Sequence, residues 1–264
     1  CILLSLQSAT GADAPAEGAP LPAIAIIIDD LGRNAVAGRR VVALPGPVAC
    51  AFLPHSAHTR PLALAAHSHN KEVMLHLPMQ TVQARTLDAG GLDLDMTEHE
   101  FVQALQRDLA AVPHVVGINN HMGSLLTRHP GHMLWLMREI NRHGKLFFVD
   151  SRTTSATVAL QVAMENGVPS LKRDVFLDND PSVAAVQAQF HHLLRRAKQQ
   201  GTALAIGHPY PGTLEVLEKL LPTLEQHGVR LVPVAEMIQL RQAENPPWHV
   251  SSYRSPKAAK NSKP

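Results

Sequence analysis

Two adjacent carboxylates stand at the position in this chain where chemistry is easiest to recognise. Asp29 and Asp30 directly follow Ala23–Ile28, an apolar run rich in β-branched residues that predicts a strand buried on both faces. Two negative charges beside such a strand raise the free-energy cost of desolvating each other. A bound cation removes that cost, so a metal ion is the natural explanation. The alternative is that one of the two only caps the following helix.

Three of the sixteen histidines each end a different predicted strand. They are His76 in His-Leu-Pro-Met, His121 in Asn-Asn-His-Met-Gly and His208 in Gly-His-Pro. The other histidines fall on predicted helices, loops or tails, and we interpret them as structural. Imidazole and carboxylate ligands together suit Zn²⁺ or a similar divalent ion, and three protein ligands leave one position open for water. Metal-bound water is a nucleophile near neutral pH, so hydrolysis of an amide or ester is the reaction class indicated.

The elements that must position these residues alternate along the chain. Strands are expected at 23–28, 48–53, 72–76, 115–119, 146–149, 171–177, 203–206 and 229–232. Helices are expected between them, among them one that opens with the capping box Thr97–Glu100 and one from Pro181 to Gly201. Alternation predicts a parallel sheet with helices packed outside it, closed as a barrel or doubly wound. In both folds the chemistry lies at the carboxyl ends of the strands, where the carboxylates and histidines stand.

Composition narrows the class of protein further. The 264 residues are 45% hydrophobic and 17% charged, which suits one large α/β domain. Residues 21–244 hold 20 basic and 20 acidic residues, so the domain lacks the net positive charge typical of nucleic-acid binding. No apolar run reaches the roughly 18–20 residues of a transmembrane helix. With two cysteines, Cys1 and Cys50, a disulfide framework is excluded.

Both ends are expected to lie outside the folded domain, which we place at 21–244. Residues 1–20 join a short apolar stretch to small residues and then a Pro/Ala/Gly run, which resembles the later part of a secretory signal peptide. The alternative is a disordered leader. Residues 245–264 are rich in Pro, Ser and Lys and predict a flexible basic tail. A secretory signal implies a periplasmic or otherwise extracytoplasmic location in a bacterial envelope.

The motifs together resemble a known family. They are IIIDDLG, EVMLHLPM, GINNHMGSLLT, FFVDSRTT, KRDVFLD and AIGHPYPGT, spread from about Ile24 to Ala235. In this order they resemble the divergent polysaccharide deacetylase family (the YibQ type), a branch of the NodB-like carbohydrate esterases. The resemblance implies a distorted (β/α) barrel of about seven parallel strands and an extracytoplasmic setting.

The resemblance also implies roles for individual residues. Asp29 corresponds to the general base and Asp30 to a metal ligand, while His208 corresponds to the general acid. Asp150 and Arg152 resemble the pair that orients and tunes the base, and Asp174 is a weaker candidate for that role. His76 corresponds to a metal ligand, but Gln80 stands where a second metal histidine is expected.

The family's Arg-Pro-Tyr motif is also absent, and His121 stands in its place. We infer that His121 supplies the missing ligand, giving Asp30, His76 and His121. Gln80 could instead bind the metal through its amide oxygen, or leave that side to water.

These features predict a metal-dependent hydrolase, with zinc as the favoured ion, that removes acetyl groups from an envelope or extracellular glycan such as peptidoglycan. Metal-bound water would attack the acetyl carbonyl, with Asp29 as base and His208 as acid. The main alternative is an inactive protein of the same fold that binds a glycan or a cell-wall partner, which Gln80 and the missing motif favour. A third reading, Asp29 as a phosphotransferase nucleophile, usually requires an Asp at the position of Leu31. The sequence does not indicate an oligomeric state.

Overall fold

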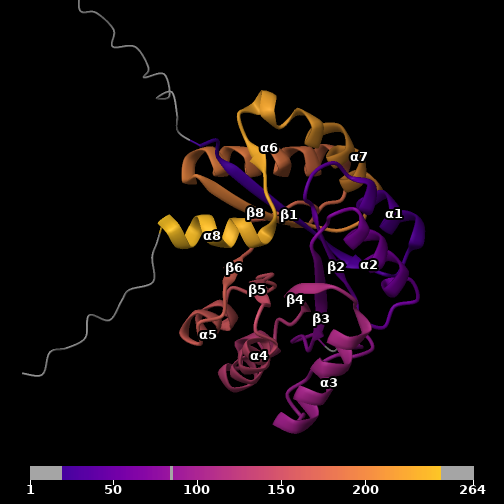
Figure 1. The fold of residues 1–264 in the computed structure, drawn as a ribbon, viewed down its shortest axis with the longest axis vertical. Coiled ribbons are helices and arrows are strands. Elements are labelled where there is room, and N and C mark those ends of the chain that lie inside the picture. The colour runs from indigo at the N-terminus through magenta and orange to yellow at the C-terminus, as the bar shows by residue number, and fades with distance from the viewer. Residues whose placement is uncertain (1–19, 84–85, 245–264) are drawn as a thin grey trace, which may run out of the picture.

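Nine parallel strands form one sheet in the computed structural model, which describes residues 20–83 and 86–244 (Figure 1). The neighbouring strands follow the order β6-β5-β4-β3-β2-β1-β8-β7, and β9 pairs with the start of β1. The strands are β1 (Ala23–Leu31), β2 (Ala49–Phe52), β3 (Val73–Met79), β4 (Val115–Met122), β5 (Phe147–Asp150), β6 (Ser170–Lys172), β7 (Val175–Phe176), β8 (Thr202–Gly207) and β9 (Arg230–Leu231).

The sheet is curled into a half-barrel, because its two outermost strands are consecutive in the chain. Only Arg173 and Asp174 separate β6 from β7. The Arg173 N–H donates to the carbonyl of Asp150 at the end of β5, and the Asp174 N–H donates to the carbonyl of Leu204 in β8. The expected single strand at 171–177 is therefore divided, since its two halves pair with different neighbours. The distorted parallel barrel expected from the sequence is confirmed.

Helices cover both faces of the curled sheet. The outward-facing side chains of β1, among them Ile24 and Ile26, belong to a core that includes Phe190 and Leu193 of α6. The helices are α1 (Ala35–Ala43), α2 (Thr59–Ser68), α3 (Glu98–Ala111), α4 (Pro130–His143), α5 (Ala159–Glu165), α6 (Val183–Gln200), α7 (Pro211–Leu220) and α8 (Val234–Glu244), with short 3₁₀ turns at Leu126–Arg128, Leu221–Thr223 and Glu225–His227.

Helix α8 covers the opposite, inward-facing side of the sheet (Figure 1). Its Val234, Met237 and Ile238 pack in a second core, where four small residues line the sheet: Ala23, Ala25, Ala49 and Ala51. Small side chains leave room for a helix inside the curve, which large residues would fill. The Glu72 carboxylate accepts hydrogen bonds from the Val234 and Ala235 N–H groups and so caps α8. One end of the half-barrel is therefore closed by α8.

Local sequence signals place several helix ends correctly. The expected capping box at Thr97 and Glu100 is present at the start of α3. The helix expected from Pro181 begins later, at Val183, because the Ser182 side chain caps it. The helix expected over 213–227 ends as α7 at Leu220, and 3₁₀ turns follow around Pro222, whose nitrogen carries no hydrogen to donate.

The expected leader and tail lie outside the part of the chain that the structure describes, apart from Pro20 at the edge of the leader. The signal-peptide character of residues 1–20, the flexibility of residues 245–264 and the extracytoplasmic location of the protein stay predictions. Within the described residues, no helix combines the length and the hydropathy needed to cross a lipid bilayer.

Candidate metal centre and active site

A β-bulge in β1 places the two adjacent carboxylates on the same side of the sheet, near His76. Between Ile28 and Leu31, β1 advances three residues while β2 advances two, so β1 carries one extra residue. Asp30 has a φ of 56°, a left-handed conformation that aspartate tolerates better than most residues. In a regular strand the two carboxylates would face opposite sides of the sheet. Here Asp29 Oδ2 and Asp30 Oδ1 lie 3.7 Å and 3.3 Å from His76 Nε2.

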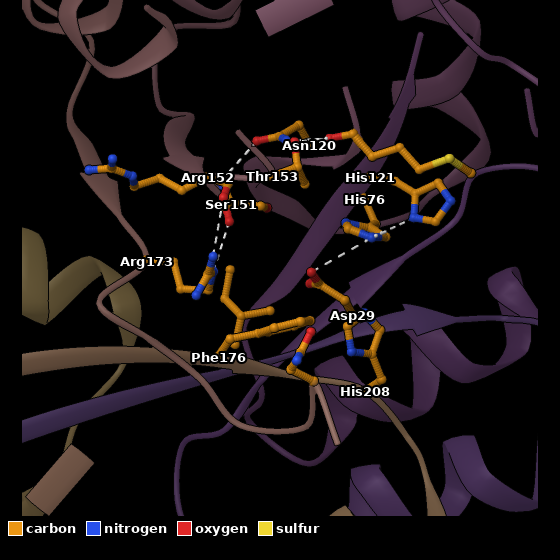
Figure 2. Close-up of a pocket in the computed structure, with 13 residues that line it drawn as sticks. Asp29, His76, Asn120, His121, Ser151, Arg152, Thr153, Arg173, Phe176 and His208 are labelled. Atoms are coloured by element: carbon orange, nitrogen blue, oxygen red, sulfur yellow. Dashed lines mark hydrogen bonds and ion pairs between the residues drawn. The ribbon is translucent and has the colours of Figure 1, made fainter. Parts of the chain in front are cut away.

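Asp30, His76 and His121 bring three ligand atoms to one point. His121 Nδ1 lies 3.0 Å from Asp30 Oδ1 and 3.1 Å from His76 Nε2. Figure 2 shows the two imidazole rings beside Asp29 at the edge of the pocket. Ligands held at zinc's preferred distances of about 2.0–2.2 Å in a tetrahedron lie about 3.3–3.6 Å apart. The three atoms therefore need to separate by only a few tenths of an ångström to admit an ion, and they form a candidate metal site.

The electrostatics of the three residues fit a cation as well. Oδ1 of Asp30 is buried, and among the described residues no donor reaches it with hydrogen-bonding geometry. Burial opposes ionisation of Asp30, but His121 and His76 hold its pKa well below the usual range. Burial likewise opposes protonation of His76, but the Asp29 and Asp30 carboxylates raise its pKa. The site therefore holds positive charge strongly, and a divalent ion would take the place of protons there.

Asn119 joins the metal site to the neighbouring carboxylate. Its side chain is fully buried within β4, where Oδ1 accepts the His76 Nδ1 hydrogen at 2.9 Å. Its Nδ2 donates to Asp29 Oδ1 at 2.8 Å and lies 3.3 Å from Ser151 Oγ. With Nδ1 of His76 occupied in this way, Nε2 is left to face the ligand cluster. Asn119 was not among the predicted site residues, because an asparagine after an apolar run resembles an ordinary turn residue in the sequence.

Replacing Asn119 by alanine should weaken zinc binding by about 10–100-fold, because His76 loses the partner that fixes its ring. The measurement is a competitive titration against a zinc chelator. Asn120→Ala is the matched control, since the Asn120 side chain is also buried but bonds only to backbone groups, Met122 O and Ser151 N. Equal losses in the two variants would contradict a specific role for Asn119.

Asp29 is buried beside this cluster without being part of it. It is 2% exposed, and its carboxylate is held by Asn119. Burial raises the pKa of Asp29, while the His76 and His208 charges work in the opposite direction. A carboxylate with a raised pKa is a stronger base than an exposed one, and it faces the space next to the metal ligands.

His208 approaches the pocket from β8, on the other side of Asp29 (Figure 2). Its Nδ1 donates to Asp178 Oδ1 at 2.9 Å, which leaves Nε2 as the nitrogen available to the pocket. Asp178 is 3% exposed and also accepts from the His208 N–H and the Thr213 hydroxyl. Burial opposes protonation, but the hydrogen bond to Asp178 and the Asp29 charge raise the pKa of His208 to about 9. The ring is therefore a proton donor at neutral pH.

The remaining candidates from the sequence lie nearby but do not contact Asp29. The Asp150 carboxylate accepts hydrogen bonds from the Arg152 N–H and the Thr157 hydroxyl. Arg152 lines the pocket, and its φ of 51° is a strained value for a residue with a side chain. Asp174 is outside the pocket and pairs with Arg196 and Arg241. Among the described contacts, Asn119 is the residue that holds Asp29.

Gln80 does not reach the ligand cluster. Its side-chain oxygen accepts the Leu94 N–H at 2.9 Å, and its backbone carbonyl accepts from Leu125 and Leu126. The bond to Leu94, with backbone bonds that join Leu92 to Pro78 and Gln80, holds residues 86–97 against the end of β3. The same segment carries Asp88, whose Oδ2 lies 3.0 Å from His121 Nε2 and 2.6 Å from Arg33 Nη2. Nothing in the sequence around Asp88 distinguishes it from an ordinary loop residue.

Asp29, His76, His121, Arg152 and His208 line one cavity of about 420 Å³ at the carboxyl ends of the strands. Asp178 was not predicted as a site residue, although it directly follows a predicted strand, as His208 does. The fold and cavity together define a parallel α/β half-barrel of the NodB-like class with an Asp/His/His candidate metal site.

Comparisons with known proteins agree with the family resemblance of the sequence motifs. The model of the family described as divergent polysaccharide deacetylase matches residues 26–238, and the chain belongs to this family. The uncharacterized protein YibQ of Escherichia coli (strain K12) is 35% identical over 221 residues, covering 84% of this chain and 69% of that protein.

Two solved structures show the likeness in fold. The uncharacterized protein ATU2773 from Agrobacterium tumefaciens C58 has a TM-score of 0.79 at 19% identity, covering 84% of this chain and 92% of that one. The peptidoglycan deacetylase PdaC from Bacillus subtilis has a TM-score of 0.51 at 10% identity, covering 85% of this chain and 93% of that one.

Proposed function

We propose that this protein is a metal-dependent hydrolase that removes acetyl groups from an envelope or extracellular polysaccharide. The observation that carries the proposal is the placement of a buried carboxylate, Asp29, between a three-residue metal site and a protonated histidine. Glycan binding alone requires neither a buried base nor a proton donor opposite it. Membership of the divergent polysaccharide deacetylase family supports the choice of acetylated glycans as substrates.

The side chains of this site divide the reaction between them. Asp29 accepts the proton of the attacking water at Oδ2, while its Oδ1 stays bonded to Asn119. His208 then donates its Nε2 proton to the departing amine or alkoxide, and Asp178 stabilises the cationic ring before that transfer. Asp30, His76 and His121 would hold the metal, for which the nitrogen and oxygen donors favour zinc. A bound divalent ion supplies Lewis-acid polarisation of the acetyl carbonyl and acidifies water.

We place the protein in the periplasm or another extracytoplasmic compartment. The signal-like pattern of residues 1–20 and the glycan substrate support this location. Fractionation of cells that produce the full-length protein tests it, and recovery in the cytoplasmic fraction would contradict it.

The test of the function is acetate release from chitooligosaccharides and peptidoglycan fragments, with zinc supplied and with zinc chelated. Zinc-dependent release supports the proposal. The absence of release across a broad panel of N-acetylated and O-acetylated glycans would favour the alternative, an inactive protein that binds a glycan or a cell-wall partner.

Replacing Asp178 by asparagine should shift the alkaline limb of the kcat profile to lower pH by roughly one unit or more. His208 has a pKa of about 9, so its donating form is present below that pH and is lost as the pH rises through it. Removing the Asp178 charge lowers the pKa of His208, and activity therefore declines earlier. Asp180→Asn is the matched control, because Asp180 is exposed and accepts the Ser182 N–H just before α6. An unchanged alkaline limb in Asp178→Asn would contradict the assignment of His208 as acid.

A further inference from the structure

One wall of the active-site cavity is formed by an arginine that makes no ion pair with any residue that the structure describes. The Arg173 Nε donates to the Ser151 carbonyl at 2.8 Å, and Nη2 donates to the Arg152 carbonyl at 3.1 Å. Its guanidinium carbon lies 4.8 Å from the centre of the Phe176 ring. Figure 2 shows the guanidinium held between these groups at the pocket edge. Its orientation is therefore fixed by two carbonyl oxygens and a ring, and its other N–H groups remain for a further partner.

The same arginine borders a second cavity. This cavity has a volume of about 350 Å³ and shares Arg152 and Arg173 with the active-site cavity, and Lys172 and Arg196 add to its lining. The acid there, Asp174, is already paired with Arg196 at 3.4 Å and Arg241 at 2.5 Å. Among the residues that the structure describes, no carboxylate lies within 4.0 Å of the charged groups of Arg152, Lys172 or Arg173. Three positive charges thus gather beside the reaction site without an ion pair of their own among the described residues.

The positive group is close enough to the proposed base to interact with it. Burial and then the neighbouring Arg152 cation lower the pKa of Arg173, and the Asp150 and Asp29 charges oppose that change. An anion placed between the two arginines would relieve their repulsion. Because the two cavities share this pair, such an anion and a group at Asp29 can belong to the same bound molecule.

We propose that Arg173, with Arg152 and Lys172, forms a subsite for a carboxylate attached to the glycan, so that the substrate is an acidic acetylated polysaccharide. The planar guanidinium fork matches a carboxylate and can donate two parallel hydrogen bonds to it. The overall charge of residues 21–244 is balanced, so this preference comes from a local group of residues and not from a general attraction to polyanions. The inference rests on the proposed function, since it names the substrate class of that site.

The test is a calorimetric titration of the full-length chain carrying Asp29→Asn, which keeps the acetyl groups in place, with zinc supplied. The probes are a tetrasaccharide of alternating N-acetylglucosamine and N-acetylmuramic acid and the same tetrasaccharide with its carboxyl groups reduced to alcohols. The acidic form should bind roughly 10–100-fold more tightly, the effect of charge-assisted hydrogen bonds. Added Arg173→Gln should remove this advantage and leave the affinity for the reduced form unchanged.

Two further variants control the result. Arg195→Gln removes an exposed charge of α6 away from both cavities and should keep the full advantage. Lys172 is exposed, so Lys172→Gln tests the subsite without disturbing the core, and the advantage should fall about 2–5-fold. Equal affinities for the two tetrasaccharides, no binding of either, or an undiminished advantage in both Arg173→Gln and Lys172→Gln would overturn the proposal.

The outcome is separable from that of the proposed function. Acetate release by the wild-type protein from neutral chitooligosaccharides, with no preference for the acidic tetrasaccharide, would overturn the subsite and leave the deacetylase. A preference for the acidic form that depends on Arg173, without acetate release from any glycan, would support the subsite and overturn the hydrolase.

Discussion

Replacing Asp29 by asparagine should lower kcat for acetate release by about 10³-fold, within the range that a general base contributes. The asparagine side chain keeps the shape of the aspartate and can still bond to Asn119, but it cannot accept the proton of the attacking water. Because Asp29 lies outside the cluster of Asp30, His76 and His121, the variant should retain its bound zinc. The two measurements are steady-state acetate release and elemental analysis of the same preparation.

Measuring turnover and zinc content together distinguishes loss of the base from loss of the metal. Asp180→Asn removes an exposed carboxylate from the segment after β7 and should keep normal activity. Retained turnover in Asp29→Asn would disprove its role as base. Loss of zinc together with turnover would instead indicate that Asp29 takes part in binding the metal.

Replacing His121 by alanine should lower zinc affinity by more than 100-fold, whereas Gln80→Ala should retain zinc. His121 Nδ1 lies 3.0 Å and 3.1 Å from the other two ligand atoms, so its removal leaves a two-ligand site. The Gln80 oxygen is occupied by the Leu94 N–H and has no such position. Elemental analysis of wild type and both variants, purified side by side, provides the measurement.

The Gln80 variant also controls for indirect damage, because it loosens the segment that carries Asp88 without removing a ligand. Zinc retained in His121→Ala but lost in Gln80→Ala would reverse the ligand assignment. An absence of zinc from the wild type, even after zinc is added, would move the function from hydrolysis to glycan binding.

The alternation of apolar runs with helical segments was sufficient to predict a parallel sheet covered by helices, because buried parallel strands are continuous apolar runs. The choice of a barrel over a doubly wound sheet came from the family resemblance. The division of 171–177 could not be predicted. No Gly or Pro marks a strand end between Leu171 and Leu177, and the separation into β6 and β7 depends on pairing with β5 and β8 on opposite sides.

The candidate site was predictable for those residues that stand at the carboxyl ends of the predicted strands, where parallel α/β folds hold their active sites. Asp29, His76, His121 and His208 all line one cavity. The observed strands are longer than predicted, since β3 continues past His76 to Met79 and β4 continues past His121 to Met122. Asp178 directly follows the predicted strand 171–177, so the same criterion could have identified it. Asn119 and Asp88 could not be found, since an amide in a turn and an acid in a loop acquire their roles from partners far away in the chain.

The bulge in β1 makes the candidate site depend on a count of residues as well as on their identity. Deleting one residue between Ile28 and Leu31 would restore regular pairing with β2, and the flanking apolar residues could keep their places in the core. Because Asp29 and Asp30 are the two residues in this interval, the deletion would remove one carboxylate and leave the other facing a single side of the sheet. Among related chains, a one-residue gap at this position would therefore mark proteins that keep the half-barrel and have lost its chemistry, even where every histidine is still present.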